Sequence, residues 1–183
     1  IDEKVIEYLL HDKHGIENII INSIHRHFKR ESDSVVAGNE VIIREVLMVF
    51  IERILHIDKA ATPFTIISFE DPVSFPLTIN READIINLRI GGRIDRVDMK
   101  DGTIKIVDYK TGKIKDTVSS LGDLFEEDRD KDLDGWLQTL LYCEAYLSGN
   151  HDTKVIPSIY KLKKVPGEKL SEKLQISDKM IVE

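Results

Sequence analysis

Two aspartates occupy positions where a predicted β-hairpin would bring them together. An Asp-Gly pair at residues 101–102 separates two apolar alternating runs, over residues 88–99 and 103–109. Asp-Gly between such runs is the strongest short-range signal for a two-residue hairpin turn. Counting back residue for residue from that turn, Asp95 faces Asp108 on the partner segment. Their side chains then share one face of the hairpin with its apolar residues.

This pairing of like charges limits what the hairpin can be. Directly opposed side chains have Cβ atoms about 5 Å apart, and like charges at that distance destabilise a strand pair. A fold tolerates the pair if one acid is protonated, if basic neighbours neutralise it, or if a cation lies between the carboxylates. Hard carboxylate oxygens suit Mg²⁺, Mn²⁺ or Ca²⁺.

A lysine completes a possible hydrolytic site. Lys110 follows Asp108 by two residues and would project beside it on the same face. Two acids, a divalent ion and a lysine form a site that can hydrolyse a phosphodiester. The acids hold the ion, the ion activates the attacking water, and the lysine orients that water or the phosphate. The alternative is a surface hairpin whose Asp and Lys side chains are solvated.

The spacing of apolar residues predicts the helices and strands that position these side chains, and it changes along the chain. Helical spacing covers residues 5–10, 16–28 and 39–56, with Asn39 as the expected N-cap, and Pro63 ends this part. Two β-rich segments follow, at residues 64–69 and 77–79, separated by Pro72 and Pro76; then come the hairpin, a helix over residues 133–147 and a strand over residues 154–162. The order of these helices and strands predicts an α/β fold with a helical part over residues 1–62 and a core over residues 63–183.

The composition excludes several classes of protein. The chain has 183 residues, a net charge of −7 and one cysteine, Cys143, which excludes a disulfide framework and an iron–sulfur cluster held by four cysteines of this chain. No run approaches the length of a membrane helix, and no secretory signal precedes the helical pattern, so we expect a cytoplasmic protein without a membrane partner. The chain begins at Ile1 inside a helical pattern, which we interpret as a fragment of a longer protein.

Local charge is the one compositional hint of a nucleic-acid partner. Residues 81–115 hold nine Lys and Arg against six Asp and Glu. Arg93 and Arg96 in this segment are therefore candidates for phosphate contacts.

Three ordered motifs carry a family resemblance. They are G-R-I-D-R-V-D from Gly92, I-V-D-Y-K-T-G-K from Ile106 and Q-T-L-L-Y from Gln138. Together they resemble the signature of the RecB-type nucleases of the PD-(D/E)XK nuclease superfamily, which include AddB-like proteins. The resemblance spans roughly residues 64–160.

The resemblance implies a fold, a reaction and roles for residues. The fold would be a restriction-endonuclease-like core, a mixed β-sheet flanked by helices and preceded by a helical segment. The activity would be Mg²⁺- or Mn²⁺-dependent hydrolysis of DNA, exonuclease or endonuclease, by a domain of a larger DNA repair or recombination protein, with a helicase domain or subunit as a possible partner. The resemblance makes Asp95, Asp108 and the Tyr109 carbonyl metal ligands, Lys110 the catalytic lysine, and Gln138 and Tyr142 residues that contact DNA or support the site.

Some features leave alternatives open. Gln138 could be an ordinary exposed helix position and Tyr142 a packing residue, while Glu70 is either a further metal ligand or a solvated strand end. No histidine follows the G-x-x-x-H pattern of active members, so we expect one upstream of Ile1. The missing cysteine quartet argues against an iron–sulfur branch. A catalytically degenerate nuclease fold that binds DNA or protein is the main alternative, and a metal-stabilised structural domain is a weaker one.

Overall fold

The computed structural model describes residues 1–31, 34–80, 84–163, 172–176 and 179–180. The chain forms two compact units, Ile1–Pro63 and Phe64–Glu183. Within the described residues, no helix combines the length and the apolar character needed to cross a membrane.

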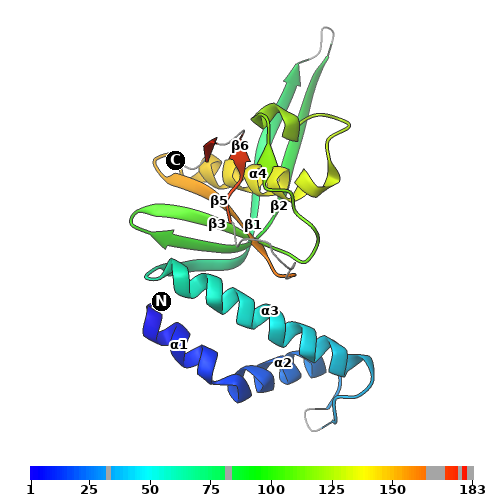
Figure 1. The fold of residues 1–183 in the computed structure, drawn as a ribbon. Coiled ribbons are helices and arrows are strands. Elements are labelled where there is room, and N and C mark those ends of the chain that lie inside the picture. Colours follow the sequence, from blue (N-terminus) through cyan, green and yellow to red (C-terminus); the bar gives the residue numbers. More distant parts are fainter. Residues whose placement is uncertain (32–33, 81–83, 164–171, 177–178, 181–183) are drawn as a thin grey trace. The chain divides into compact units, whose positions relative to one another are not determined.

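The first unit consists of three helices (Figure 1). They are α1 (Glu3–His11), α2 (Lys13–His27) and α3 (Asn39–Ala61). The carboxylates of Asp2 and Asp12 cap the first two helices by accepting backbone N–H groups 3.0 Å away. The third helix starts at Asn39 with Gly38 as its N-cap and no side-chain cap, so the expectation that Asn39 would be the cap was wrong.

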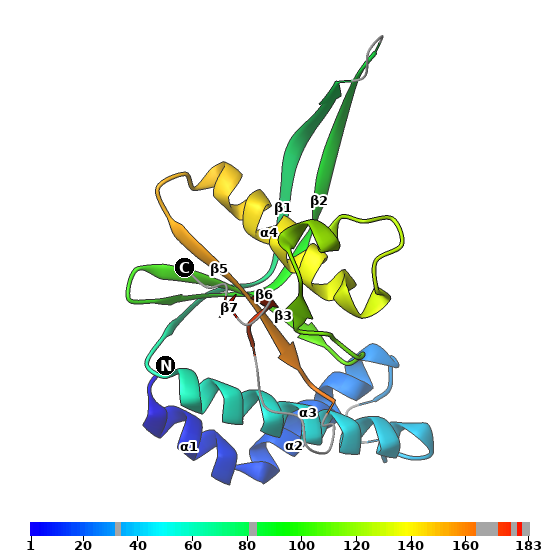
Figure 2. The ribbon, with the colours of Figure 1, turned by 45° about the horizontal axis from the view of Figure 1, so that its top comes forward.

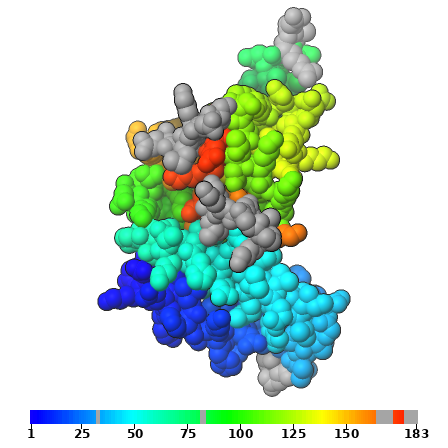
Figure 3. Space-filling view, in the orientation of Figure 1, coloured from blue at the N-terminus to red at the C-terminus, as the bar shows by residue number. Residues whose placement is uncertain are grey.

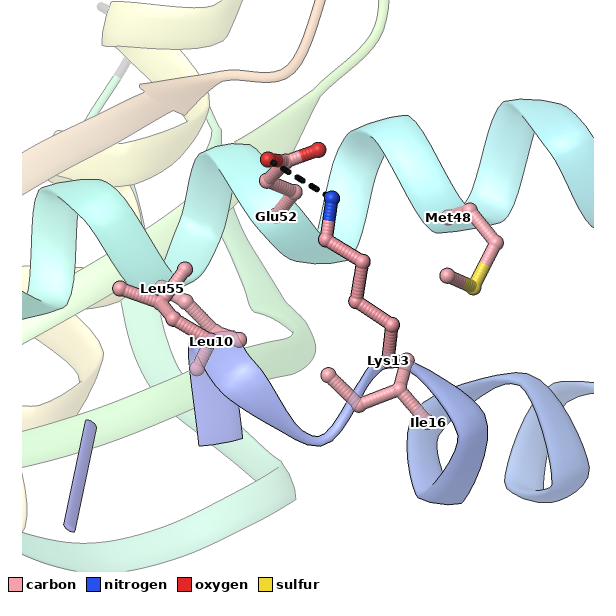
Figure 4. A pocket seen from close by; sticks show the side chains of 6 residues that line it. All are labelled: Leu10, Lys13, Ile16, Met48, Glu52 and Leu55. Carbon is pink, nitrogen blue, oxygen red and sulfur yellow. Dashed lines mark ion pairs between the residues drawn. The ribbon is translucent and has the colours of Figure 1, made fainter. Parts of the chain in front are cut away.

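A small pocket lies between the helices of this unit. Figure 4 shows this pocket beside α3, where Lys13 of α2 lies 3.8 Å from Glu52 of α3. Its volume of about 30 Å³ is enough for a water or two.

The second unit is built on a mixed sheet in the strand order β1-β2-β3-β5. The strands are β1 (Thr65–Asn80), β2 (Ile85–Lys100), β3 (Thr103–Lys110) and β5 (Lys154–Lys161). Neighbouring strands are antiparallel except for β3 and β5, which are parallel. Helix α4 (Asp134–Gly149) contacts all four strands and crosses the sheet in Figure 2. This confirms the predicted α/β fold with a mixed sheet and flanking helices.

Short elements fill the connection between β3 and α4. They are β4 (Thr117–Val118) and the 3₁₀ turns η1 (Leu121–Leu124) and η2 (Lys131–Leu133). Strand β4 joins β6 (Gln175–Ile176) and β7 (Lys179–Met180) in a small second sheet.

The hairpin between β2 and β3 has the predicted turn and register. Asp101 and Gly102 both have positive φ, of 50° and 75°, as a type I′ turn requires. Lys100 pairs with Thr103 across the turn, and the pairing continues in step to Arg96 and Val107.

Strand β1 is longer than the sequence pattern predicted. The two expected β segments form one continuous strand that runs through Pro72 and Pro76. Both prolines are tolerated because β1 is an edge strand of the four-stranded sheet, where a missing N–H leaves no ladder partner unpaired. The far ends of β1 and β2 form an arm that stands clear of the rest of this unit (Figures 1 and 3).

Two apolar clusters hold the sheet and its cover together. One joins β2 and β3 to α4, and its buried members are Ile94, Val97, Ile104, Ile106 and Cys143. The other lies around Trp136 and Ile159, both at most 1 % exposed. Trp136 and Cys143 are both buried packing residues, and burial raises the pKa of the Cys143 thiol to about 12.

Candidate active site

The end of β3 places an acid and a lysine side by side. Asp108 and Lys110 point to the same face of the strand because side chains alternate with period two. The Asp108 side chain is 3 % exposed, and its Oδ2 lies 2.7 Å from Lys110 Nζ. Burial raises the pKa of Asp108, the Lys110 ammonium lowers it, and the nearby Asp95 carboxylate raises it again, with a net increase.

Asp95 joins this pair through the backbone rather than as a ladder partner. The β2–β3 register ends at Arg96 and Val107, one position before the two aspartates. There the Asp95 carboxylate accepts a hydrogen bond of 2.8 Å from the backbone N–H of Tyr109. This bond fixes Asp95 against the residue that follows Asp108, and the Asp95 carboxylate lies close enough to raise the pKa of Asp108.

Helix α4 supplies the remaining polar groups. Gln138 Oε1 accepts a 2.7 Å hydrogen bond from Lys110 Nζ, and Gln138 Nε2 donates a 2.7 Å bond to the Tyr142 hydroxyl. The two residues share one helix face, being four positions apart. An ammonium only donates, so the amide oxygen must face the lysine and the amide nitrogen the tyrosine. The structure therefore joins Asp108, Lys110, Gln138 and Tyr142 in one chain of contacts.

Two glycines allow the helix to approach the strands this closely. A Cβ on Gly92 of β2 would lie 2.6 Å from the Tyr142 ring. A Cβ on Gly135, at the start of α4, would lie 2.8 Å from Ile114 Cδ1 and 3.4 Å from Lys110 Cε. Glycine inside a strand often marks a close approach of another group, so Gly92 carried a signal that the sequence analysis did not use.

Gly92→Ala is expected to lower the free energy of unfolding by about 1–3 kcal/mol, the range found for overpacked sites, because Tyr142 must move away. Urea denaturation followed by tryptophan fluorescence measures the change. Gly112→Ala is the matched control, since its new Cβ would meet nothing within 4 Å. Equal stability of the two variants would contradict the proposed contact.

The donor set fits a hard divalent cation. Among the described residues, no three or more His, Cys, Asp or Glu side chains gather at one point, so Asp95 and Asp108 stand as a pair. Mg²⁺ commonly takes one or two carboxylates and completes its shell with water and substrate phosphate. Asp108 Oδ2 is buried and, although paired in charge with Lys110, accepts no well-aligned hydrogen bond within the described part of the chain. An oxygen in that situation suits a cation.

Arg96, a predicted phosphate contact, is not brought to this site. It lies on the opposite face of β2, 2 % exposed, and its guanidinium donates two hydrogen bonds, of 2.7 and 2.6 Å, to Asp98. The same group donates to the Tyr109 hydroxyl at 3.1 Å and stacks on Phe64. Arg96 is thus part of the core, because strand alternation turns it away from Asp95.

The other basic candidates lie on the surface beside acids. Arg93 lies 3.8 Å from Glu70, and both side chains are about two-thirds exposed. Glu70 has a positive φ of 52° and its carboxylate is directed to Arg93. Lys113, another basic residue of the segment 81–115, is 83 % exposed and lies 2.9 Å from Asp132, whose side chain is 28 % exposed.

Comparison with known proteins identifies one family. A sequence model described as the PD-(D/E)XK nuclease superfamily matches residues 17–180, which include parts of both units and every residue of the site. A search of curated proteins finds no match.

Proposed function

Because this chain belongs to the PD-(D/E)XK nuclease superfamily, we propose that it is a metal-dependent deoxyribonuclease of the RecB type. Superfamily membership supports a nuclease that binds DNA, and divalent metals are general in this group. The observation that supports the finer proposal is the contact chain at the end of β3. It brings together an acid pair, a lysine and a helix glutamine.

In this proposal Asp95 and Asp108 hold Mg²⁺ or Mn²⁺, with the Tyr109 carbonyl as a further ligand. The bound ion would supply a water of lowered pKa and offset the negative charge that develops on phosphate. The chain's own residues prepare the rest of the reaction centre. The Tyr109 N–H holds the Asp95 carboxylate in place, and burial keeps Asp108 from turning into solvent.

Lys110 positions the attacking water or the phosphate. Its ammonium lies between Asp108 Oδ2 and Gln138 Oε1, each 2.7 Å away. A fixed positive charge at this place stabilises charge in the transition state without reorganisation. Gln138 is then a positioning residue, since it holds the lysine and is in turn held by Tyr142.

We further propose that the domain belongs to a larger repair or recombination protein and works beside a helicase domain or subunit. The motif strings at Gly92, Ile106 and Gln138 support this, because they resemble RecB-type nucleases in order and spacing.

The test is cleavage of labelled single- and double-stranded DNA with Mg²⁺ or Mn²⁺. Asp95→Asn is a sharp comparison, because an asparagine oxygen can still accept the Tyr109 N–H while one metal-binding charge is lost. We expect cutting that stops with a chelator and falls at least a hundredfold in the variant, as several kcal/mol of metal stabilisation would predict. DNA binding without cutting by either protein would support a degenerate nuclease fold instead, and unchanged cutting by Asp95→Asn would refute the site.

A further inference from the structure

We propose that a cavity beside Gln138 and Tyr142 binds one unpaired nucleobase of the strand being cut. This inference rests on the proposed nuclease function and names the form of DNA that the site takes. The cavity has a volume of about 180 Å³ and lies where α4 runs alongside β1 and β2 (Figure 2). Its lining consists of Phe75, Ile90, Gly91, Gln138, Leu141, Tyr142 and Ala145.

The cavity has the size and lining of a site for a flat aromatic ring. An apolar protein cavity of about 150 Å³ binds benzene, so 180 Å³ admits a ring of similar size. Phe75 and Tyr142 supply aromatic rings, and Ile90, Leu141 and Ala145 supply aliphatic surface. Bases stack on such aromatic side chains with little dependence on sequence.

A glycine of β2 forms part of the cavity wall. Gly91 lines the cavity, and a Cβ at that position would lie 2.7 Å from the Val73 carbonyl oxygen, so no larger residue fits there without moving backbone. Gly91 and Gln138 are exposed whereas Phe75 and Ala145 are buried. The cavity therefore opens to solvent on the side of Gly91 and Gln138 and closes toward Phe75 and Ala145.

The cavity and the reaction centre share Gln138. Gln138 contributes to the cavity wall and, through Oε1, accepts the 2.7 Å bond from Lys110. A base in the cavity would thus lie one side chain away from the lysine that positions the attack on phosphate. In a nucleotide only the sugar separates base from phosphate, so one residue of DNA can span both places. The Gln138 amide and the Tyr142 hydroxyl are the polar groups of the lining that the edge of a bound base would meet.

A paired base cannot enter this cavity, because its Watson–Crick edge is bonded to the complementary base and its two faces are stacked on neighbouring bases. The substrate must present an unpaired nucleotide, which either a single strand or the frayed end of a duplex can supply. We therefore expect single-stranded DNA to be cut faster than a blunt duplex, while a duplex with a frayed end lies between them.

The direct test compares two oligonucleotides that differ only in their bases. One is a short single strand, and the other has the same sugar-phosphate chain with every base removed. Fluorescence anisotropy in Ca²⁺ measures their affinities for the wild-type chain and for Ala145→Leu, which fills the cavity. We expect base removal to weaken binding to the wild type about tenfold, as the loss of one stacked base predicts, and to leave Ala145→Leu with equal affinities for both.

Two controls accompany this test, one for the folding of the variant and one for the specificity of the effect. Thermal unfolding shows whether Ala145→Leu is folded, and Glu144→Gln, an exposed change on the same helix outside the cavity, should behave as the wild type in both assays. Equal affinity of the wild type for the two oligonucleotides, or no binding of either, would overturn the base site. Because binding is measured without cutting, that result is distinct from failure of the nuclease proposal, which is a loss of metal-dependent cleavage.

Discussion

Asp108→Asn is expected to reduce DNA cleavage about a thousandfold or more while leaving the protein folded. Asparagine keeps the shape of the buried side chain but removes the charge that would hold the cation and that attracts Lys110 at 2.7 Å. Loss of several kcal/mol of transition-state stabilisation corresponds to about three decades in rate. Single-turnover cleavage at saturating Mg²⁺ measures the change.

The stability of this variant separates a catalytic role from a structural one. The Asp108 side chain is 3 % exposed, so its charge is held in a poorly solvated place, and a neutral amide of the same shape removes that cost. We expect a melting temperature equal to or above that of the wild type. A variant that melts earlier in proportion to its loss of activity would show that Asp108 acts through the fold alone.

Arg96→Ala is expected to lower the free energy of unfolding by about 3–5 kcal/mol, the range measured when one partner of a buried ion pair is removed. Asp98, 1 % exposed, would lose both of its hydrogen bonds from the guanidinium and remain as a buried charge. Phe64 and Tyr160 would also lose the cation that stacks on them, at 5.1 and 5.6 Å from their ring centres. Urea unfolding measures the loss.

A double variant tests whether the unpaired charge is the cause. Arg96→Met with Asp98→Leu replaces the pair by apolar groups of similar size, and such replacements of buried ion pairs are often neutral or stabilising. We expect the double variant to recover most of the stability that Arg96→Ala loses. If Arg96→Ala instead unfolds like the wild type but binds DNA more weakly, Arg96 contacts phosphate, as the local excess of positive charge suggested.

The hairpin was predictable because it depends on local rules. An Asp-Gly pair supplies the two positive φ angles of a type I′ turn, and a two-residue turn leaves one register for the flanking strands. The same alternation placed Asp108 and Lys110 on one face. Helical spacing alone placed Gln138 and Tyr142 on one side of α4.

Strand β1 shows where local rules fail. Its two prolines predicted a break, yet the strand is continuous, because proline is excluded from the middle of a sheet and tolerated at its edge. Whether a strand is central or at the edge depends on the order of all strands, and sequence spacing carries no information on that order. The prediction that Arg96 contacts phosphate was wrong for a related reason, since its burial depends on Phe64 and Tyr160, which come from distant parts of the chain.

Turn type, strand alternation and helix period act over a few residues, so they were enough to predict which groups could do chemistry and the local geometry of each pair. That these pairs meet depends instead on contacts between distant segments. Strand β5 pairs in parallel with β3, and α4 crosses to lay Gln138 against Lys110. Glycine at position 92 permits Tyr142 to lie against β2, and the cavity forms beside that contact. These arrangements join segments far apart in the chain, and the packing of the whole sheet against its helix selects them.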